Sequence, residues 1–261
     1  MHFTQQFNAR KYHFSNLFRE QKQMRHSLHK LLLSTLIFLF SCTLALAAEI
    51  QVITSGAFAE ALKSLAPEYE KTSTNKVIIS YGSSMGAATD SIPSRLARGE
   101  KFDVLILAGP ALEDFIKSGA VQPGTRVDLV ASVMGGVVKS GAPKPDISTM
   151  EGLKSALLNA KSVAYSASAS GVYLSTELFP KMGIAEQMSK TARKIYSERV
   201  ASVVARGEAE LGFQQVSELI PIKGVDFIGE LPPEAQKTVL FSAGITNNVS
   251  NLNASRDLIA F

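Results

Sequence analysis

The chain has 261 residues, 46% of them hydrophobic, and a formal net charge of +4. The first 47 residues contain six of the 27 Lys and Arg residues but only one of the 23 acidic residues, so the remainder carries 21 basic and 22 acidic residues and a net charge of −1. This nearly neutral remainder gives no reason to expect a nucleic-acid partner.

The part of the chain after position 47 contains no histidine, cysteine or tryptophan. All four histidines (His2, His13, His26 and His29) and the single cysteine, Cys42, precede that position. This excludes zinc sites built from histidine or thiolate, Ser-His-Asp triads and cysteine nucleophiles. We therefore expect neither a metal nor another cofactor.

A secretory signal peptide is predicted at the start of the chain. The basic stretch MRHSLHK precedes the apolar run LLLSTLIFLFSCTLAL and the small-x-small cleavage pattern Ala45-Leu46-Ala47. We expect a signal peptide at 1–47, cleavage after Ala47, a periplasmic protein, and translation from Met24 rather than Met1. The alternatives are a membrane anchor, for which an apolar run of about 16 residues is short, and a lipoprotein modified at Cys42.

Short apolar runs alternate with amphipathic segments from residue 50 onward, which predicts an α/β protein. Strands are expected at 50–53, 76–80 and 103–109, and helices at 57–71, 90–99 and 110–119. This βαβαβα order predicts a mostly parallel sheet with helices on both faces.

Two longer apolar segments, at 128–139 and 237–245, are suited to crossing between two lobes. We therefore expect a two-lobe α/β fold with lobe 1 at 48–128 plus 243–261, lobe 2 at 129–242, and a ligand cleft between them. A single doubly wound domain is the alternative. The last segment, NASRDLIAF, begins a helical pattern without a terminator, so we expect the native domain to continue beyond it.

Three segments place small polar residues between a strand end and a helix start: ITSGAFAEAL, YGSSMGAATDSI and YSASASGVYLSTEL. Helix N-termini offer unpaired N–H groups, so three of them at one cleft would bind an anion without a cationic side chain. Each segment alone is also typical of ordinary caps and turns. Neither GxxxxGK[ST] nor GxGxxG follows a predicted strand, which argues against a nucleotide site.

Taken together, these segments resemble the periplasmic molybdate-binding proteins, substrate-binding components of ABC transporters with the two-lobe type II fold. The resemblance is carried by VITSGAFAEAL, YGSSMG, ARGEKFDVLILAG, ASGVYLSTELF, ERVASVVARGEAELGF and FSAGI. It implies a monomeric receptor for a small anionic ligand, a carboxylate or an oxyanion, with an ABC-transporter permease as partner.

The family's ligand positions are matched only in part. Ala57 stands where the family has an oxyanion-binding serine, and Gln215 replaces its tyrosine, so two hydroxyl donors for a tetrahedral oxyanion are missing. Met85 stands where the family has a small residue or threonine, which points to a larger ligand. Ligand contacts are expected from Ser55, Gly56, Ala57, Ser83, Ser84, Met85, Ser170, Tyr173, Arg199, Val200 and Gln215.

A subgroup resembling this family comprises the aconitate isomerases, which interconvert trans- and cis-aconitate by an allylic proton shift. Without histidine, the proton shift would need a carboxylate, a tyrosine or a lysine. The candidates are Glu177, Glu198 and Tyr173, while Arg199 is suited to bidentate carboxylate binding. We expect first a binding protein for a small polycarboxylate, with an aconitate isomerase or a molybdate and tungstate transport protein as alternatives.

Overall fold

The computed structural model describes residues 47–261. The predicted leader up to residue 46, with Met24 and Cys42, lies outside the described residues. None of the helices in the described part combines the length and hydropathy that a membrane span requires.

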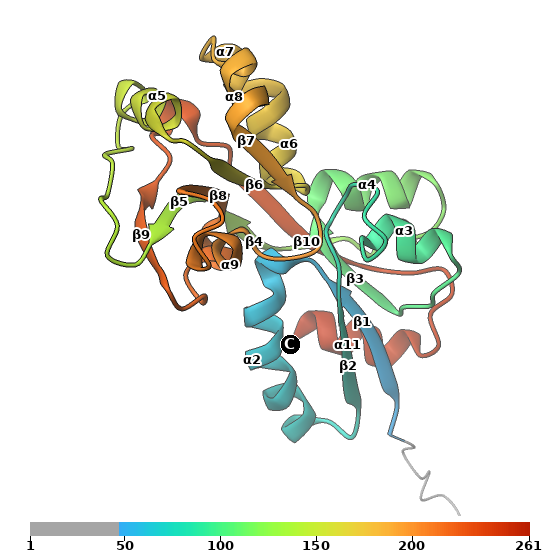
Figure 1. Ribbon diagram of the computed structural model, residues 1–261. Helices are drawn as coiled ribbons and strands as arrows, with labels where there is room; N and C mark the ends of the chain where they lie inside the picture. Colours follow the sequence, from blue (N-terminus) through green and yellow to red (C-terminus); the bar gives the residue numbers. More distant parts are fainter. Residues whose placement is uncertain (1–46) are drawn as a thin grey trace, which may run out of the picture. The chain divides into compact units, whose positions relative to one another are not determined.

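The described residues form two five-stranded mixed sheets, each flanked by helices (Figure 1). The first sheet has the order β2-β1-β3-β10-β4, in which β2, β1 and β3 run parallel and β10 runs antiparallel to both of its neighbours. Its strands are β1 (Glu49–Thr54), β2 (Lys76–Tyr81), β3 (Val104–Ala108), β4 (Val127–Ser132) and β10 (Val239–Ile245). The helices of this lobe are α2 (Gly56–Thr72), α3 (Ile92–Ala97), α4 (Gly109–Lys117) and α11 (Leu252–Ala260).

The second sheet repeats this design with the order β7-β6-β8-β5-β9. Strands β7, β6 and β8 run parallel, and β5 runs antiparallel to β8 and β9. Its strands are β5 (Met134–Lys139), β6 (Val163–Ser166), β7 (Ala192–Ile195), β8 (Leu211–Gln215) and β9 (Val225–Glu230). The helical segments are α5 (Met150–Asn159), α6 (Ala169–Tyr173), the π-helical turn η1 (Leu174–Leu178), α7 (Phe179–Lys181), α8 (Ala185–Thr191), α9 (Val200–Ala205), α10 (Val216–Leu219) and the 3-10 turn η2 (Pro233–Ala235).

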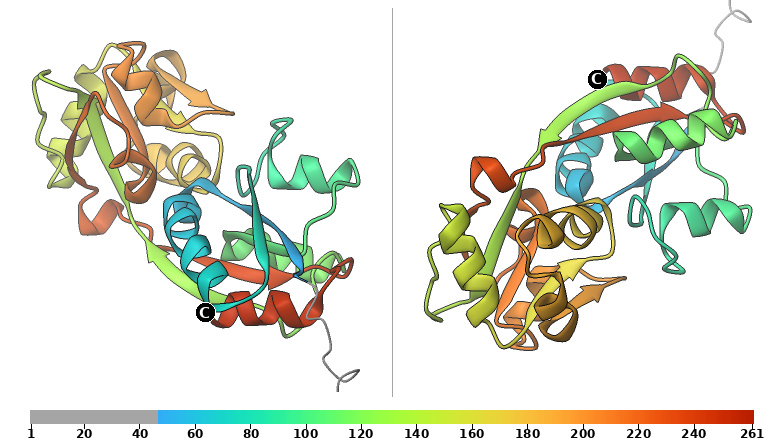
Figure 2. Two further views of the ribbon diagram at one scale, coloured as in Figure 1. Left: turned by 90° about the horizontal axis from the view of Figure 1, so that it is seen from below. Right: turned by 90° about the horizontal axis from the view of Figure 1, so that it is seen from above.

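The chain passes between the two sheets twice. Only Val133 separates β4 from β5, and the return runs through residues 231–238 from β9 to β10 (Figure 2). The two-lobe α/β fold is confirmed, with mixed rather than mostly parallel sheets. The pairing of β4 with β10 places residues up to Ser132, and residues from Val239 onward, in the first sheet. The expected limits of this lobe were 128 and 243, because an apolar pattern does not reveal which sheet a strand joins.

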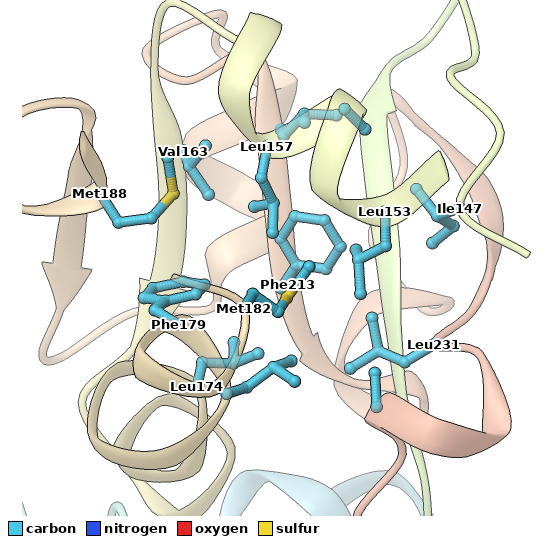
Figure 3. Packing of buried hydrophobic residues seen from close by; sticks show 14 of the residues in the cluster. Ile147, Leu153, Leu157, Val163, Leu174, Phe179, Met182, Met188, Phe213 and Leu231 are labelled. Carbon is cyan, nitrogen blue, oxygen red and sulfur yellow. The ribbon is translucent and has the colours of Figure 1, made fainter. Parts of the chain in front are cut away.

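Each sheet has a hydrophobic core of its own. In the first lobe, α2 buries Phe58, Leu62 and Tyr69 against the sheet. In the second lobe, Phe213 of β8 lies among apolar residues from α5, η1 and α7 (Figure 3). Every residue of β3 and of β8 is buried, as expected for central strands with helices on both faces. These cores fix the strand ends from which the polar loops extend.

Candidate functional site

A cavity of about 440 Å³ lies where the carboxyl ends of β1, β2, β6 and β8 meet. This is the edge at which α/β sheets place their ligands, since the loops after parallel strands converge there. The volume falls within the range of about 300–1,000 Å³ that is usual for small-molecule sites. Residues of both lobes form the wall, so the cavity lies between the two lobes.

The three polar loops meet at this cavity. Ser55 and Gly56 begin α2, Ser83 and Ser84 follow β2, and Ser170 lies in α6. Glu198, Arg199 and Gln215 also line the wall. The structure thus brings together eight of the residues expected at the site: Ser55, Gly56, Ser83, Ser84, Ser170, Glu198, Arg199 and Gln215.

Three other expected ligand residues do not line the cavity. Ala57 is buried against Ala108 and Phe241, and Met85 packs on the apolar core of the first lobe. Val200 is buried, and its backbone N–H donates to Gln214 Oε1 at 2.9 Å, so this donor is already used inside the protein.

Tyr173 and Glu177 also lie away from the cavity wall. The Tyr173 hydroxyl donates to the Ala235 carbonyl at 3.0 Å, and burial raises the pKa of this phenol, with a further contribution from Glu177. Glu177 pairs with Lys237 at 2.6 Å, and both side chains are about half exposed. Tyr165, the other tyrosine near the third loop, packs edge to face on Phe179.

Two buried polar atoms of the wall have no hydrogen-bond partner within residues 47–261. These are Ser55 Oγ and Gln215 Nε2, whose residues are 3% and 1% exposed. Gln215 Oε1 accepts from Ser132 Oγ at 2.9 Å, which fixes the orientation of the amide. A buried donor without a partner costs about 1–3 kcal/mol, so each of these donors would gain from an acceptor oxygen that comes within its reach.

Ser84 connects the wall to the sheet beneath it. Its hydroxyl accepts from the Ala108 N–H at 3.0 Å, and its own backbone N–H donates to Ser168 Oγ of the other lobe at 3.1 Å. Because the hydroxyl accepts from Ala108, its proton remains free to be donated elsewhere.

Ser84→Ala is expected to lower the free energy of unfolding by about 1–3 kcal/mol, because it leaves the buried Ala108 N–H without an acceptor. Urea unfolding measures this change. Ser64→Ala, at an exposed position of α2, is the control and should change stability by less than about 0.5 kcal/mol. Equal effects of the two variants would contradict the assigned role of Ser84.

Glu218 is a wall residue that the sequence analysis missed. It lies in α10, one turn after β8, and Gln214 Nε2 donates to its Oε2 at 2.6 Å. Burial raises the pKa of this carboxyl to about 7, although Arg199 acts in the opposite direction. The sequence signal for Glu218 is the polar pair Gln214-Gln215 at a strand end, followed by an acid one turn later. Nothing in that pattern distinguishes Glu218 from an acidic residue on the surface.

Besides the Ser132–Gln215 bond beside the first crossing, three polar contacts join the lobes at the cavity. Arg199 Nη2 donates to Glu60 Oε1 at 2.7 Å, Ser197 Oγ donates to Asp90 Oδ1 at 3.1 Å, and the third is the Ser84–Ser168 bond. The Arg199 pair lowers the pKa of Glu60. These contacts hold the two walls together around the cavity.

The described residues contain no group of three or more His, Cys, Asp or Glu side chains placed to hold a metal ion. The chemistry of the wall is instead that of serine and tyrosine hydroxyls, side-chain amides, one arginine, one lysine and several carboxyls. Such a wall can bind an organic or inorganic anion through hydrogen bonds.

Comparison with known proteins agrees with this architecture. The chain is 45% identical over 210 residues to an aconitate isomerase from Pseudomonas sp., covering 80% of each protein. It is 28% identical over 206 residues to the molybdate-binding protein ModA of Azotobacter vinelandii, covering 75% of each. The solved periplasmic molybdate-binding protein of Azotobacter vinelandii superimposes with a TM-score of 0.63 at 21% identity, over 81% of this chain and 91% of that one.

The resemblance predicted from the sequence is therefore confirmed, both to the molybdate-binding proteins and to the aconitate isomerase subgroup. The sequence profile of the bacterial extracellular solute-binding proteins matches residues 50–261. The chain belongs to the family of bacterial extracellular solute-binding proteins.

Proposed function

We propose that this protein is an aconitate isomerase, the first alternative raised by the sequence. The observation that carries the proposal is the cavity wall, where two unpaired buried donors, Ser55 Oγ and Gln215 Nε2, lie with Arg199 and an ionisable carboxyl. The 45% identity to a protein named aconitate isomerase supports the same conclusion. Binding of a polycarboxylate, the primary expectation from the sequence, is the first step of this function.

A tricarboxylate suits this wall better than a tetrahedral oxyanion. A cavity of about 440 Å³ exceeds what a four-oxygen anion fills. Its donors are spread over both lobes, from Ser55 and Ser84 on one side to Ser170, Arg199 and Gln215 on the other. Separate groups of donors match carboxylates on separate carbon atoms, and the arginine guanidinium binds a carboxylate through two parallel hydrogen bonds.

The test is to mix the purified secreted protein with trans-aconitate and to follow the formation of cis-aconitate. Thermal-shift titrations with molybdate, tungstate, sulfate and citrate complete the comparison. Turnover together with stabilisation by the tricarboxylates is the expected result. Absence of turnover together with sub-micromolar tungstate binding would overturn the proposal in favour of an oxyanion transport protein.

The second candidate is a receptor that binds a polycarboxylate and delivers it to an ABC-transporter permease. Membership of a solute-binding family and the two-lobe cleft favour it. Stabilisation by trans-aconitate without isomerisation would select this candidate.

Arg199→Gln is expected to weaken binding of trans-aconitate about 10- to 100-fold, because a hydrogen-bonded charge pair contributes about 1.5–3 kcal/mol. Isothermal titration calorimetry measures the change. Arg193→Gln is the matched control, because Arg193 is exposed, pairs with Glu208 and lies outside the cavity wall. Equal affinity of the two variants would remove Arg199 from the site.

We further propose that the protein acts as a monomer in the periplasm after cleavage behind Ala47. N-terminal sequencing of the secreted protein should then give Ala48 as the first residue. The lobes are proposed to move about Val133 and residues 231–238, the two crossings between the sheets.

A further inference from the structure

We propose that Glu218 is the residue that moves the proton in this reaction, taking it from one allylic carbon of aconitate and returning it to the other. The inference rests on the proposed function. It assigns a catalytic role to a residue outside the three serine- and glycine-rich loops, and it replaces the earlier candidates Glu177 and Tyr173, which do not line the cavity.

The carboxyl of Glu218 has a fixed orientation. Val200 N–H donates to Gln214 Oε1, so the amide of Gln214 must direct its Nε2 the other way, and this nitrogen donates to Glu218 Oε2 at 2.6 Å. The amide therefore holds one carboxyl oxygen in place and leaves Oε1 for the substrate. A positioned carboxyl with one free oxygen is what general acid–base catalysis requires.

The first lobe leaves room for this carboxyl. Gly56, the first residue of α2, lies so close to it that a Cβ at this position would overlap Glu218 Oε2 and approach Cδ to 2.7 Å. Position 56 thus accepts only glycine while Glu218 occupies its observed place. The start of α2 and the side chain of Glu218 form one continuous part of the wall.

The other carboxyls of the wall are already engaged by partners within the protein. Glu60 pairs with Arg199 at 2.7 Å, and Glu198 pairs with Arg206 at 2.9 Å. Asp90 accepts from Ser197 in an exposed hydrogen bond. Glu218 is the one wall carboxyl whose hydrogen bonds within residues 47–261 come from an amide alone.

The surroundings of Glu218 keep it ready to exchange a proton near neutral pH. The charged and titratable groups around the cavity are Glu60 and Lys63 of α2, Asp90, Glu198 and Arg199, and the phenols Tyr81 and Tyr196. Burial is the main influence on Glu218 and raises its pKa to about 7, with Arg199 acting against it. About half of the molecules then carry the base at neutral pH, and the conjugate acid is strong enough to return the proton.

The reaction balances with this single group. The Glu218 carboxylate removes a proton from the methylene carbon of trans-aconitate, and the electrons of that C–H bond delocalise over the allylic carbons and their carboxylates. The Glu218 carboxylic acid then donates the proton to the carbon that was the far end of the double bond. The double bond has moved by one position, in the cis geometry, and the carboxylate is regenerated without any co-reactant.

The decisive experiment follows trans-aconitate in D₂O by NMR with the wild type, Glu218→Gln and Glu177→Gln. We expect Glu218→Gln to lose at least about 100-fold of both isomerisation and deuterium incorporation, the usual scale of a general base. Thermal stabilisation by trans-aconitate should persist in this variant. Glu177→Gln, which removes an exposed carboxyl outside the cavity, should behave as the wild type.

Isomerisation by Glu218→Gln within tenfold of the wild type would overturn the assignment. If Glu218→Gln no longer binds trans-aconitate, Glu218→Asp is the deciding variant. Binding by Glu218→Asp with isomerisation at least about tenfold slower than the wild type supports the catalytic role. Isomerisation by Glu218→Asp at the wild-type rate overturns it. In the wild type, kcat/KM should rise about tenfold from pH 6 to pH 8 as the carboxyl ionises. A wild type without turnover would overturn the proposed function itself, which is a different outcome from an active Glu218→Gln variant.

Discussion

Glu218→Gln is expected to stabilise the unliganded protein by up to about 3 kcal/mol at pH 8 and by almost nothing near pH 4.5. The carboxyl has a pKa of about 7 in the folded protein and an ordinary value of 4.5. Between these values the folded protein binds a proton that the unfolded chain releases, so wild-type stability falls as pH rises through this window. Glutamine remains neutral throughout and avoids this loss.

Urea unfolding of the two proteins at several pH values measures the difference, which corresponds to a shift of roughly 6–12 °C in melting temperature for a domain of this size. Glu177→Gln is the control, since Glu177 forms an exposed ion pair that contributes less than about 1 kcal/mol. A difference between Glu218→Gln and wild type that stays constant from pH 4.5 to pH 8 would show that Glu218 titrates as an ordinary carboxyl.

Gly171→Ala is expected to destabilise the protein by about 3 kcal/mol or more, although alanine favours helices by itself. A Cβ at this position of α6 would overlap the Ser166 carbonyl oxygen, approach the Ser166 carbonyl carbon to 2.6 Å and meet Tyr165 Cδ2 at 2.9 Å. Two of these contacts are with backbone atoms, which cannot rotate away. The start of α6 must therefore move away from the end of β6.

This displacement should also weaken binding of trans-aconitate, because it carries Ser168 and Ser170 away from the cavity. Urea unfolding and calorimetry report the two effects. Thr176→Ala, at an exposed position one turn further along, should leave both within about 0.5 kcal/mol of wild type. A Gly171→Ala protein as stable as Thr176→Ala would show that α6 is not tightly seated on β6.

Much of the fold was predictable because it depends on local patterns. The strands at 50–53 and 103–109 and the helix at 57–71 correspond to β1, β3 and α2, since their apolar spacing and their boundary residues agree. The direction of β10 was not predictable. Its antiparallel pairing with β3 depends on where the chain returns after the second lobe, which is a property of the whole topology.

The same distinction between local patterns and overall topology applies to the candidate site. Ser55, Ser84 and Ser170 follow strand ends, and the convergence of such loops is general in α/β sheets. Glu177 was expected at the site because it lies one turn into the helix after the third loop, and Tyr173 because it flanks that loop. The observed helix directs them instead toward Lys237 and Ala235. Glu218 was missed because its burial arises from α10 meeting α2 across the cleft, a contact between distant parts of the chain.

The contacts between the lobes also affect how quickly a bound molecule can leave. Release requires the Arg199–Glu60 ion pair, the Ser197–Asp90 bond and the Ser84–Ser168 bond to open together, while Val133 and residues 231–238 bend. In an enzyme, this opening can limit the overall rate more than the proton transfer does. Salt screens the partly exposed ion pair, so product release should become faster as ionic strength increases.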